Sequence, residues 1–320
     1  MNENHVIKIS ANLSISDWQV RNTIQLLNDG ATIPFISRYR KEATGSLDEV
    51  QIAAIKDMLA KLQEIDSRRE TILKTIEEQG NLTEELKKRI EQAETLTELE
   101  DIYLPYKPKK KTRATKAKER GLEPLAKIIM KQQELNIVAK AEQFINDEVP
   151  TVDDALQGAR DIIAEWVNEN ERARNSIRRL YQHEAIISSR SVKGKELEGI
   201  KYKDYFEWDE PLKRCPSHRL LAMRRGENEG FLKISISPDA EKAIEILEQQ
   251  FVRGSFDVSE QVAEAVKDSY KRLLSPSIEN EFMAASKEKA DEEAIRVFAE
   301  NLRQLLLASP LGQKNVLAID

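Results

Sequence analysis

Cysteine, glycine, proline and aromatic residues are all scarce in this chain of 320 residues. A single cysteine, Cys215, excludes an internal disulfide and is typical of a reducing compartment. The chain has eleven glycines and ten prolines, which is about half the usual share of a soluble domain. Because strands and tight turns need these residues, the composition predicts a mainly α-helical protein.

Long apolar runs are absent as well. No stretch of the sequence approaches the roughly 20 apolar residues that a membrane-spanning helix needs. The first ten residues, MNENHVIKIS, lack the basic segment and the apolar segment of a secretory signal. We therefore expect a soluble, cytoplasmic protein that has no membrane partner.

The familiar catalytic motifs are missing too. The chain contains neither GxxxxGK[ST] nor a GxGxxG that follows a strand, so the sequence does not support nucleotide binding through those loops. Cys215 and His218 form one C-x-x-H pair, whereas a structural zinc site needs four ligands. A packing role is therefore favoured for Cys215, and we predict no catalytic residue, no metal site and no cofactor.

An acidic cluster at Glu207, Asp209 and Glu210 lies between aromatic residues. Paired carboxylates can hold a divalent cation. A solvated turn explains the same three residues, and we favour the turn.

Residues 1–187 are expected to form one helical region. The segment 46–103 has Gly80 as its only helix breaker, and apolar residues before it recur at steps of three and four. This spacing predicts one long amphipathic helix. Shorter helices are predicted at 84–93, at 97–103 and, as a pair or as one long helix, within 155–185.

Helix starts are predicted from a hydroxyl or amide side chain at the cap position, which accepts hydrogen bonds from unpaired backbone N–H groups. An acid near the third helical position adds a favourable interaction with the helix dipole. The predicted caps are Ser46, Asn81, Thr97, Thr151, and Ser237 before Pro238.

Glycine, proline and aromatic residues crowd into the segment 188–238, which predicts irregular, turn-rich structure. One short strand is expected at 230–237, where apolar and polar residues roughly alternate. Helices are predicted to resume at 239–252, 258–275 and 287–308.

The last residues differ in character. Residues 316–319 are an apolar, β-favouring run that is followed by Asp320. Because a buried strand needs neighbours for its backbone groups, we expect a fragment cut where an α/β domain begins. An aspartate at the end of such a strand is a metal ligand in two-metal nucleases of the RNase H-like fold. One acid without its partners does no chemistry, so the fragment should be inert.

Positive charge is concentrated in residues 107–120, which hold eight Lys or Arg and one acid. The local charge is +7, whereas the whole chain carries −6 and the remainder therefore −13. Such a cluster can bind nucleic-acid phosphate and displace counterions, although a solvated loop that aids solubility explains it equally well. With Pro105 and Pro108 at its entry and Gly121 at its end, we expect a defined surface loop. The residues expected to contact phosphate are Lys107, Lys109, Lys110, Lys111, Arg113, Lys116 and Lys118.

A second short basic segment contains an aromatic residue, which suits base stacking together with phosphate contact. It consists of Arg38, Tyr39, Arg40 and Lys41. Further groups of basic residues occur at 172–179, 193–203 and 214–225. Because the chain has 56 acids, each such group alone is expected to be a solvated or salt-bridged surface. Convergence of two groups on one surface would favour nucleic-acid binding instead.

Four long motifs resemble one known family. They are GATIPFISRYRKEATGSLDE at 30–49, YLPYKPKKKTRATKAKERGLEPLA at 103–126, DYFEWDEPLKRCPSHRLLAMRRGENEGFL at 204–232 and the terminal NVLAID. In this order, over essentially all 320 residues, the chain resembles the bacterial Tex family of transcription accessory proteins. The resemblance implies an N-terminal helical region with a helix-turn-helix-like portion, built around a long central helix. It also implies that NVLAID begins a YqgF/RNase H-like domain, followed by helix-hairpin-helix modules and an OB-fold RNA-binding domain.

The family is associated with nucleic-acid binding and transcription, and it shares its architecture with a eukaryotic transcription elongation factor. The resemblance therefore implies a non-enzymatic scaffold that gives auxiliary, sequence-tolerant contacts to RNA or DNA. The alternative is a protein-interaction module that docks the transcription machinery or other Tex domains. The expected fold is an elongated multi-helix array. Its expected parts are an N-terminal helical region at 1–187, a turn-rich segment at 188–238, central helices at 239–309 and a first strand at 310–320.

Overall fold

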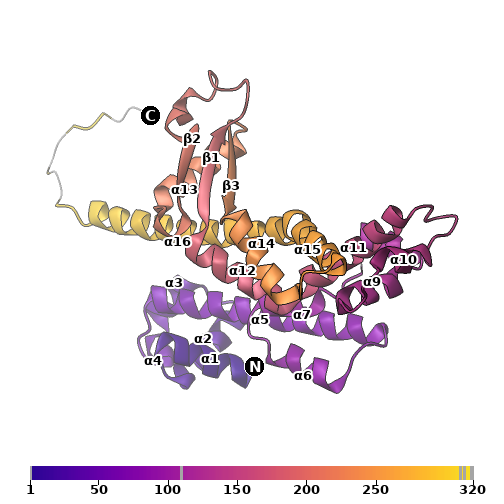
Figure 1. Ribbon diagram of the computed structural model, residues 1–320. Coiled ribbons are helices and arrows are strands. Elements are labelled where there is room, and N and C mark those ends of the chain that lie inside the picture. Colours follow the sequence, from indigo (N-terminus) through magenta and orange to yellow (C-terminus); the bar gives the residue numbers. More distant parts are fainter. Residues whose placement is uncertain (1, 109–110, 310–311, 313–314, 318–320) are drawn as a thin grey trace. The chain divides into compact units, whose positions relative to one another are not determined.

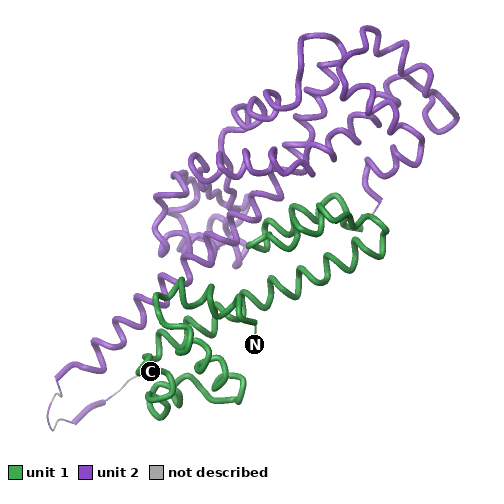
Figure 2. The backbone as a smooth tube through the Cα atoms, turned by 90° about the horizontal axis from the view of Figure 1, so that it is seen from below, with its two compact units in different colours: residues 1–108 green, residues 109–320 purple. Residues whose placement is uncertain are grey.

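The computed structural model describes residues 2–108, 111–309, 312 and 315–317. α-Helix dominates these residues, which confirms the predicted fold class, and one small antiparallel sheet accompanies it. The chain divides into two compact units, unit 1 at residues 1–108 and unit 2 at residues 109–320 (Figure 2).

Unit 1 is organised along one long helix. Its helices are α1 (Glu3–Leu13), α2 (Asp17–Asn28), α3 (Ile33–Tyr39), α4 (Lys41–Thr44), α5 (Glu49–Glu78), α6 (Glu84–Gln92) and α7 (Leu96–Tyr103) (Figure 1). The first half of α5 buries Ile52 and Ile55 among side chains of α1, α2 and α3. Its second half buries Ile72 and Ile76 among side chains of α6 and α7. The predicted long amphipathic helix is confirmed, and it joins two separate apolar clusters.

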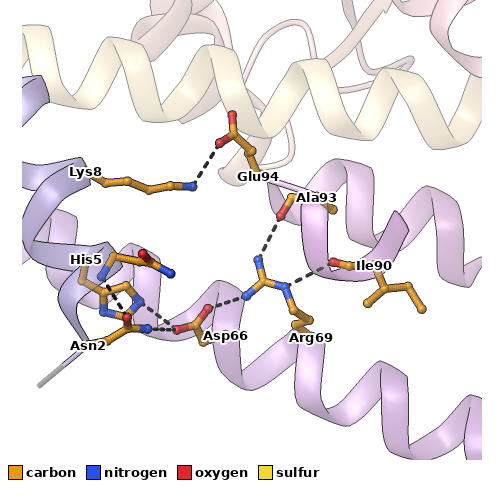
Figure 3. A network of polar contacts seen from close by, with 9 residues as sticks. Asn2, His5, Lys8, Asp66, Arg69, Ile90, Ala93 and Glu94 are labelled. Atoms are coloured by element: carbon orange, nitrogen blue, oxygen red, sulfur yellow. Dashed lines mark hydrogen bonds and ion pairs between the residues drawn. The ribbon is translucent and has the colours of Figure 1, made fainter. Parts of the chain in front are cut away.

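Polar contacts hold the middle of α5, between these two clusters (Figure 3). Asp66 Oδ2 lies 2.7 Å from Nε2 of the buried His5, and Asp66 also pairs with Arg69. Arg69 donates to the carbonyl oxygens of Ile90 at 3.2 Å and Ala93 at 2.9 Å. Burial alone would raise the pKa of Asp66, but the hydrogen bonds and charges of His5 and Arg69 outweigh it and leave that pKa lowered. The network ties α1 and the end of α6 to α5.

Most of the predicted helix caps are wrong by two residues. Asp48, Thr83, Thr95 and Asp239 cap α5, α6, α7 and α14, whereas Thr151 caps α11 as predicted. Ser46 follows Gly45 with a φ of 64°, a left-handed conformation that does not suit a cap. The observed caps of α5 and α7 belong to capping boxes, in which the side chain three residues later bonds back to the backbone N–H of the cap residue. This side chain is Gln51 in α5 and Glu98 in α7.

Unit 2 combines helices with the sheet. Its α-helices are α8 (Arg113–Glu119), α9 (Glu123–Lys131), α10 (Ile137–Glu142), α11 (Val152–Glu169), α12 (Glu171–Glu184), α13 (Ser217–Asn228), α14 (Ala240–Phe251), α15 (Asp257–Ser269) and α16 (Ser275–Leu306). Short turns of other helix types are η1 (Ile200–Tyr205), η2 (Leu212–Arg214) and the π-helical η3 (Tyr270–Leu274). The segment predicted as one or two helices is the pair α11 and α12. Asn170 separates them and caps α12 by accepting from Ala173 N at 3.0 Å.

The segment predicted to be turn-rich contains three strands and a helix. Strand β1 (Ile186–Ser191) pairs antiparallel with β2 (Glu207–Pro211) and with β3 (Leu232–Ser237), in the order β2-β1-β3 (Figure 1). Helices α13 and α16 pack against β3. The predicted strand is β3. The expectation of irregular structure at β1 and β2 is wrong because cross-strand hydrogen bonds hold these strands, whose sequences IISSRS and EWDEP carry little apolar alternation.

The acidic cluster lies on β2 and not in a turn. Asp209 pairs with Arg190 of β1, with Oδ2 and Nη2 2.7 Å apart, and this hydrogen bond lowers the pKa of Asp209. Glu210 accepts from Arg219 at 2.6 Å. Two of the three acids are therefore partners of arginines.

Helix α16 begins at Ser275 rather than near residue 287 as predicted. The π-helical turn η3 joins it to α15, and Pro276 falls in the first turn of α16. Proline is tolerated in a first turn because its missing N–H would have no partner within the helix. Pro276 therefore does not mark the break between helices that its sequence position suggests.

Three predictions about organisation stay predictions. They are the helix-turn-helix-like portion, the boundaries of the four expected parts, and the start of an α/β domain near the last residues. Residues 315–317 adopt no strand, and residues 318–320, with Asp320, lie outside the described residues.

Candidate nucleic-acid interface

The basic segment at 107–120 contains a short helix, α8. Thr112 caps α8 by accepting a hydrogen bond from Thr115 N at 3.0 Å. Ala114 and Ala117 are buried, and α8 packs against α11. A Cβ atom added at Gly158 of α11 would lie 2.3 Å from Leu122 Cδ1 and 3.4 Å from Ala117 Cβ, so the missing side chain at Gly158 leaves room for Leu122, which follows α8. The expectation of a surface loop is therefore wrong for residues 113–119.

Cationic side chains cover the outer face of α8. Arg113 and Lys116 of α8 are exposed, as is Arg120, the C-cap residue that follows the helix. Their spacing of three and four residues places them on one side. Among the described residues, Lys116 and Arg120 have no ion-pair partner. Lys107 and Lys111 are exposed as well, whereas Lys109 and Lys110 lie outside the described residues.

The inner side of α8 meets carboxylates of α11. Lys118 Nζ lies 3.7 Å from Oε2 of the buried Glu165, and Thr112 Oγ1 donates to Glu165 Oε1 at 3.1 Å. Burial raises the pKa of Asp161. The positive charges of Arg272 and Arg113 offset part of this rise. Lys118 and Arg113 are thus partly neutralised within unit 2, and they are less available to a ligand than Lys116.

The second predicted set surrounds the junction of α3 and α4 in unit 1. Arg38, Tyr39, Arg40 and Lys41 are all exposed. Arg38 Nη2 lies 3.4 Å from a carboxylate oxygen of Glu49, whereas Arg40 and Lys41 have no ion pair among the described residues.

Sequence reasoning missed an aromatic partner in this set. The rings of Phe35 and Tyr39 lie 5.5 Å apart, and the guanidinium carbon of Arg40 lies 5.4 Å from the centre of the Phe35 ring. It likewise missed Arg120, the C-cap residue of α8. Helical spacing could have found both, because Phe35 precedes Tyr39 by four residues and Arg120 follows Lys116 by four.

Each of the other basic groups contains at least one cation with an ion-pair partner, in keeping with a solvated or salt-bridged surface. Arg174 and Arg178 both pair with Glu281 at 2.7 Å. In the other groups the pairs are Arg219 with Glu210, Arg224 with Glu227 and Lys201 with Glu229. These cations are therefore much less available for phosphate than Lys116 and Arg120.

Metal and thiol chemistry find little support in the geometry. Within the described residues, no group of three or more His, Cys, Asp or Glu side chains is placed to hold a metal ion. Burial, with the nearby Glu210, raises the pKa of the Cys215 thiol to about 12, so the reactive thiolate form is disfavoured. No helix in the described ranges has the length and apolar character to cross a membrane.

Comparison with known proteins decides the family. A model of the Tex-like protein N-terminal domain matches residues 3–77, and a model described as Tex central region-like matches residues 132–298. The chain belongs to the Tex family. The predicted resemblance is thereby confirmed. The junction of α3 and α4 lies within the first match, whereas α8 lies between the two matched ranges.

Several relatives match nearly the whole chain. The uncharacterized protein YdcI of Bacillus subtilis is 44% identical over 318 residues, which cover 98% of this chain and 44% of YdcI. The transcriptional accessory protein Tex of Neisseria gonorrhoeae is 42% identical over 318 residues, with 98% and 42% covered. The human S1 RNA-binding domain-containing protein 1 is 29% identical over 337 residues, with 100% and 34% covered. The chain thus spans less than half the length of these relatives.

Proposed function

We propose that this chain is a non-enzymatic, cytoplasmic part of a Tex-type transcription accessory protein. It supplies a helical scaffold that contacts the phosphate backbone of RNA or DNA without reading the base sequence. The proposed contact residues are Lys107, Lys109, Lys110, Lys111, Arg113, Lys116 and Lys118, with Arg38, Tyr39, Arg40 and Lys41 as a second set.

One observation carries the proposal: Lys116 and Arg120 are exposed without ion-pair partners among the described residues, in a chain of net charge −6. With 56 acids in the chain, unpaired neighbouring cations on one helix face form a local anion site. Phosphate is the anion that a flexible row of Lys and Arg binds without sequence preference. We therefore add Arg120 to the proposed contacts.

The names of two relatives also support a role in transcription and nucleic-acid binding. One relative is named a transcriptional accessory protein and another an S1 RNA-binding domain-containing protein. Only a few free cations serve each surface, so the contact is auxiliary and its affinity is modest. Binding should be tightest at low salt, because screening weakens exposed charge pairs.

Fluorescence anisotropy of labelled RNA and duplex DNA tests the proposal. Replacing Lys111, Lys116 and Arg120 together by alanine should weaken binding of both nucleic acids by about tenfold or more at low salt, since three phosphate contacts are lost. These side chains are exposed, so the fold should be retained.

The matched control removes the same amount of charge elsewhere. Lys127, Lys201 and Lys242 lie in ion pairs with Glu123, Glu229 and Glu184. Their joint replacement by alanine should change the affinity little. Absence of binding at low salt, or equal losses in the two triple variants, would refute the proposed phosphate contact.

A second candidate function is protein interaction, and α16 favours it. Ile295, Phe298, Leu302 and Leu305 recur at steps of three and four, and between 43% and 74% of each side chain is exposed. A cavity of about 600 Å³ lies beside this helix, lined by α13 and α16 residues that include Leu221 and Phe298. Binding of purified RNA polymerase to the chain, lost on Phe298→Asp, would support a docking role. Equal binding by that variant would count against it.

A further inference from the structure

Helix α3 displays an exposed pair of aromatic rings. Phe35 and Tyr39 are 41% and 66% exposed, and their ring centres lie 5.5 Å apart with a 40° angle between the planes. Ile36 and Ser37, which lie between them in sequence, are buried. The helix therefore has a separate packing face, and the two rings are not needed to fill the core of unit 1.

Cations border this aromatic pair. The guanidinium carbon of Arg40 lies 5.4 Å from the centre of the Phe35 ring, which limits the movement of that side chain. Arg40 and Lys41 are exposed and have no ion pair among the described residues. Arg38 is held by Glu49 at 3.4 Å. The aromatic pair thus lies beside Lys41 and beside Arg40, whose guanidinium already contacts the Phe35 ring.

We propose that Phe35 and Tyr39 form a stacking surface for an unpaired nucleobase, while Arg40 and Lys41 bind the neighbouring phosphates. This inference rests on the proposed function, because it takes nucleic acid as the ligand. It extends that function from phosphate contact to recognition of bases that are free of a duplex.

The chemistry of stacking explains the selectivity. Every base has a flat π face, so stacking on an aromatic side chain is tolerant of sequence. In a duplex, neighbouring base pairs cover both faces of each base. An aromatic ring on a protein surface therefore cannot stack on a base inside a duplex. The pair should therefore favour single strands, whereas the α8 cations contact single and double strands through phosphate alone.

An abasic oligonucleotide separates stacking from charge. Labelled oligothymidylate of about twelve nucleotides and an abasic oligomer of the same length carry equal numbers of phosphates. The unmodified chain should bind the base-containing strand about tenfold more tightly, the equivalent of one stacked base. Joint replacement of Phe35 and Tyr39 by alanine should abolish this preference and leave affinity for the abasic strand unchanged.

Two further variants make the test specific. Phe298→Ala removes an aromatic side chain of similar exposure, 68%, from α16, and it should keep the preference for bases. Tyr39→Trp should also keep it, and its fluorescence should be quenched on addition of oligothymidylate but not of the abasic strand. A merely structural role for Tyr39 would not produce this quenching.

Each outcome has one meaning. If the chain binds both strands equally, or if the Phe35 and Tyr39 double variant keeps the preference, the stacking surface is refuted and phosphate contact stands. If the chain binds neither strand at low salt, both the stacking inference and the proposed function fail.

Discussion

Lys116 and Arg120 differ from several arginines of unit 2 in having no acidic partner among the described residues. Arg174 and Arg178 share Glu281, and Arg219 pairs with Glu210. An arginine already held by a carboxylate must lose that contact before it binds phosphate, and an exposed free cation loses only hydration. At the scale of single residues, the presence or absence of an acidic partner therefore identifies candidate phosphate contacts better than the number of positive charges does.

Gly45 is predicted to be the most sensitive glycine of unit 1. Its φ is +65°, and an added Cβ atom would lie 2.6 Å from Gln19 Nε2 and 2.7 Å from Trp18 Cη2. Gly45→Ala should lower the free energy of unfolding by about 2 kcal/mol through backbone strain and crowding. Gly80 is the matched control, because its φ is +70° and nothing lies within 4 Å of the added atom. Gly80→Ala should cost only about 1 kcal/mol, and equal losses in urea denaturation would contradict the crowding argument.

Asp66 should make the stability of unit 1 sensitive to acid. Its pKa is lower in the folded chain than its usual value of 3.8. The carboxylate therefore stabilises the fold above the usual pKa, and this stabilisation is lost as the pH falls through the lowered value. Asp66→Asn should cost about 1 kcal/mol at neutral pH.

The cost of Asp66→Asn should shrink as the pH falls below 3.8 and through the lowered native pKa, because the carboxylate is then protonated first in the unfolded chain and next in the folded chain. Hydrogen exchange of α1 and α5 amides measures the effect. Asp57→Asn is the control, since Asp57 is exposed on the same helix and has no ion pair among the described residues. A cost for Asp66→Asn that stays constant from neutral to acidic pH would contradict the linkage.

At the scale of elements, α8 depends on its neighbour. A helix of seven residues is too short to be stable alone in water, and its contacts with α11 compensate. Glu165 is central among these, because it accepts from Thr112 and lies beside Lys118. The packing of α8 against α11 therefore determines that Lys116 and Arg120 are exposed to solvent.

Glu165→Ala should loosen α8 without unfolding unit 2. Loss of the acceptor at the helix cap and of the charge pair should cost about 1 to 2 kcal/mol. Hydrogen exchange should rise in residues 113–120 and stay unchanged in β1 and β3. Glu264→Ala is the control, since Glu264 pairs with Arg160 and not with α8. Unchanged exchange in α8 after Glu165→Ala would show that the alanine packing alone seats the helix.

Helices were more predictable from the sequence than strands for a physical reason. The apolar residues of α5 are spaced so that they fall on its buried faces. The pattern along this one segment is therefore sufficient to predict the helix. Strands β1 and β2 are held by partners that lie far along the chain, such as Arg190 with Asp209, and a local pattern does not contain that information. The same reasoning explains the candidate site: the basic residues of 107–120 were evident, but their division into free and neutralised cations depended on Glu165 and Asp161 of α11.

At the scale of the whole molecule, local surfaces matter more than net charge. The chain carries −6, so its overall field opposes association with a polyanion. Unit 1 offers a cationic surface at the junction of α3 and α4, and unit 2 offers another on α8. The proposed binding relies on these surfaces, which predicts a small number of phosphate contacts and a correspondingly modest dependence on salt.

The salt dependence of duplex DNA binding tests the central claim most directly. Each phosphate contact contributes about 0.9 to the slope of log K against log salt concentration for duplex DNA. Replacing Lys111, Lys116 and Arg120 by alanine should reduce the magnitude of that slope by about 2 to 3. The charge-matched variant at Lys127, Lys201 and Lys242 should leave it unchanged. A slope that is the same in the unmodified chain and in the α8 variant would contradict the assignment of α8 as a phosphate-contacting surface.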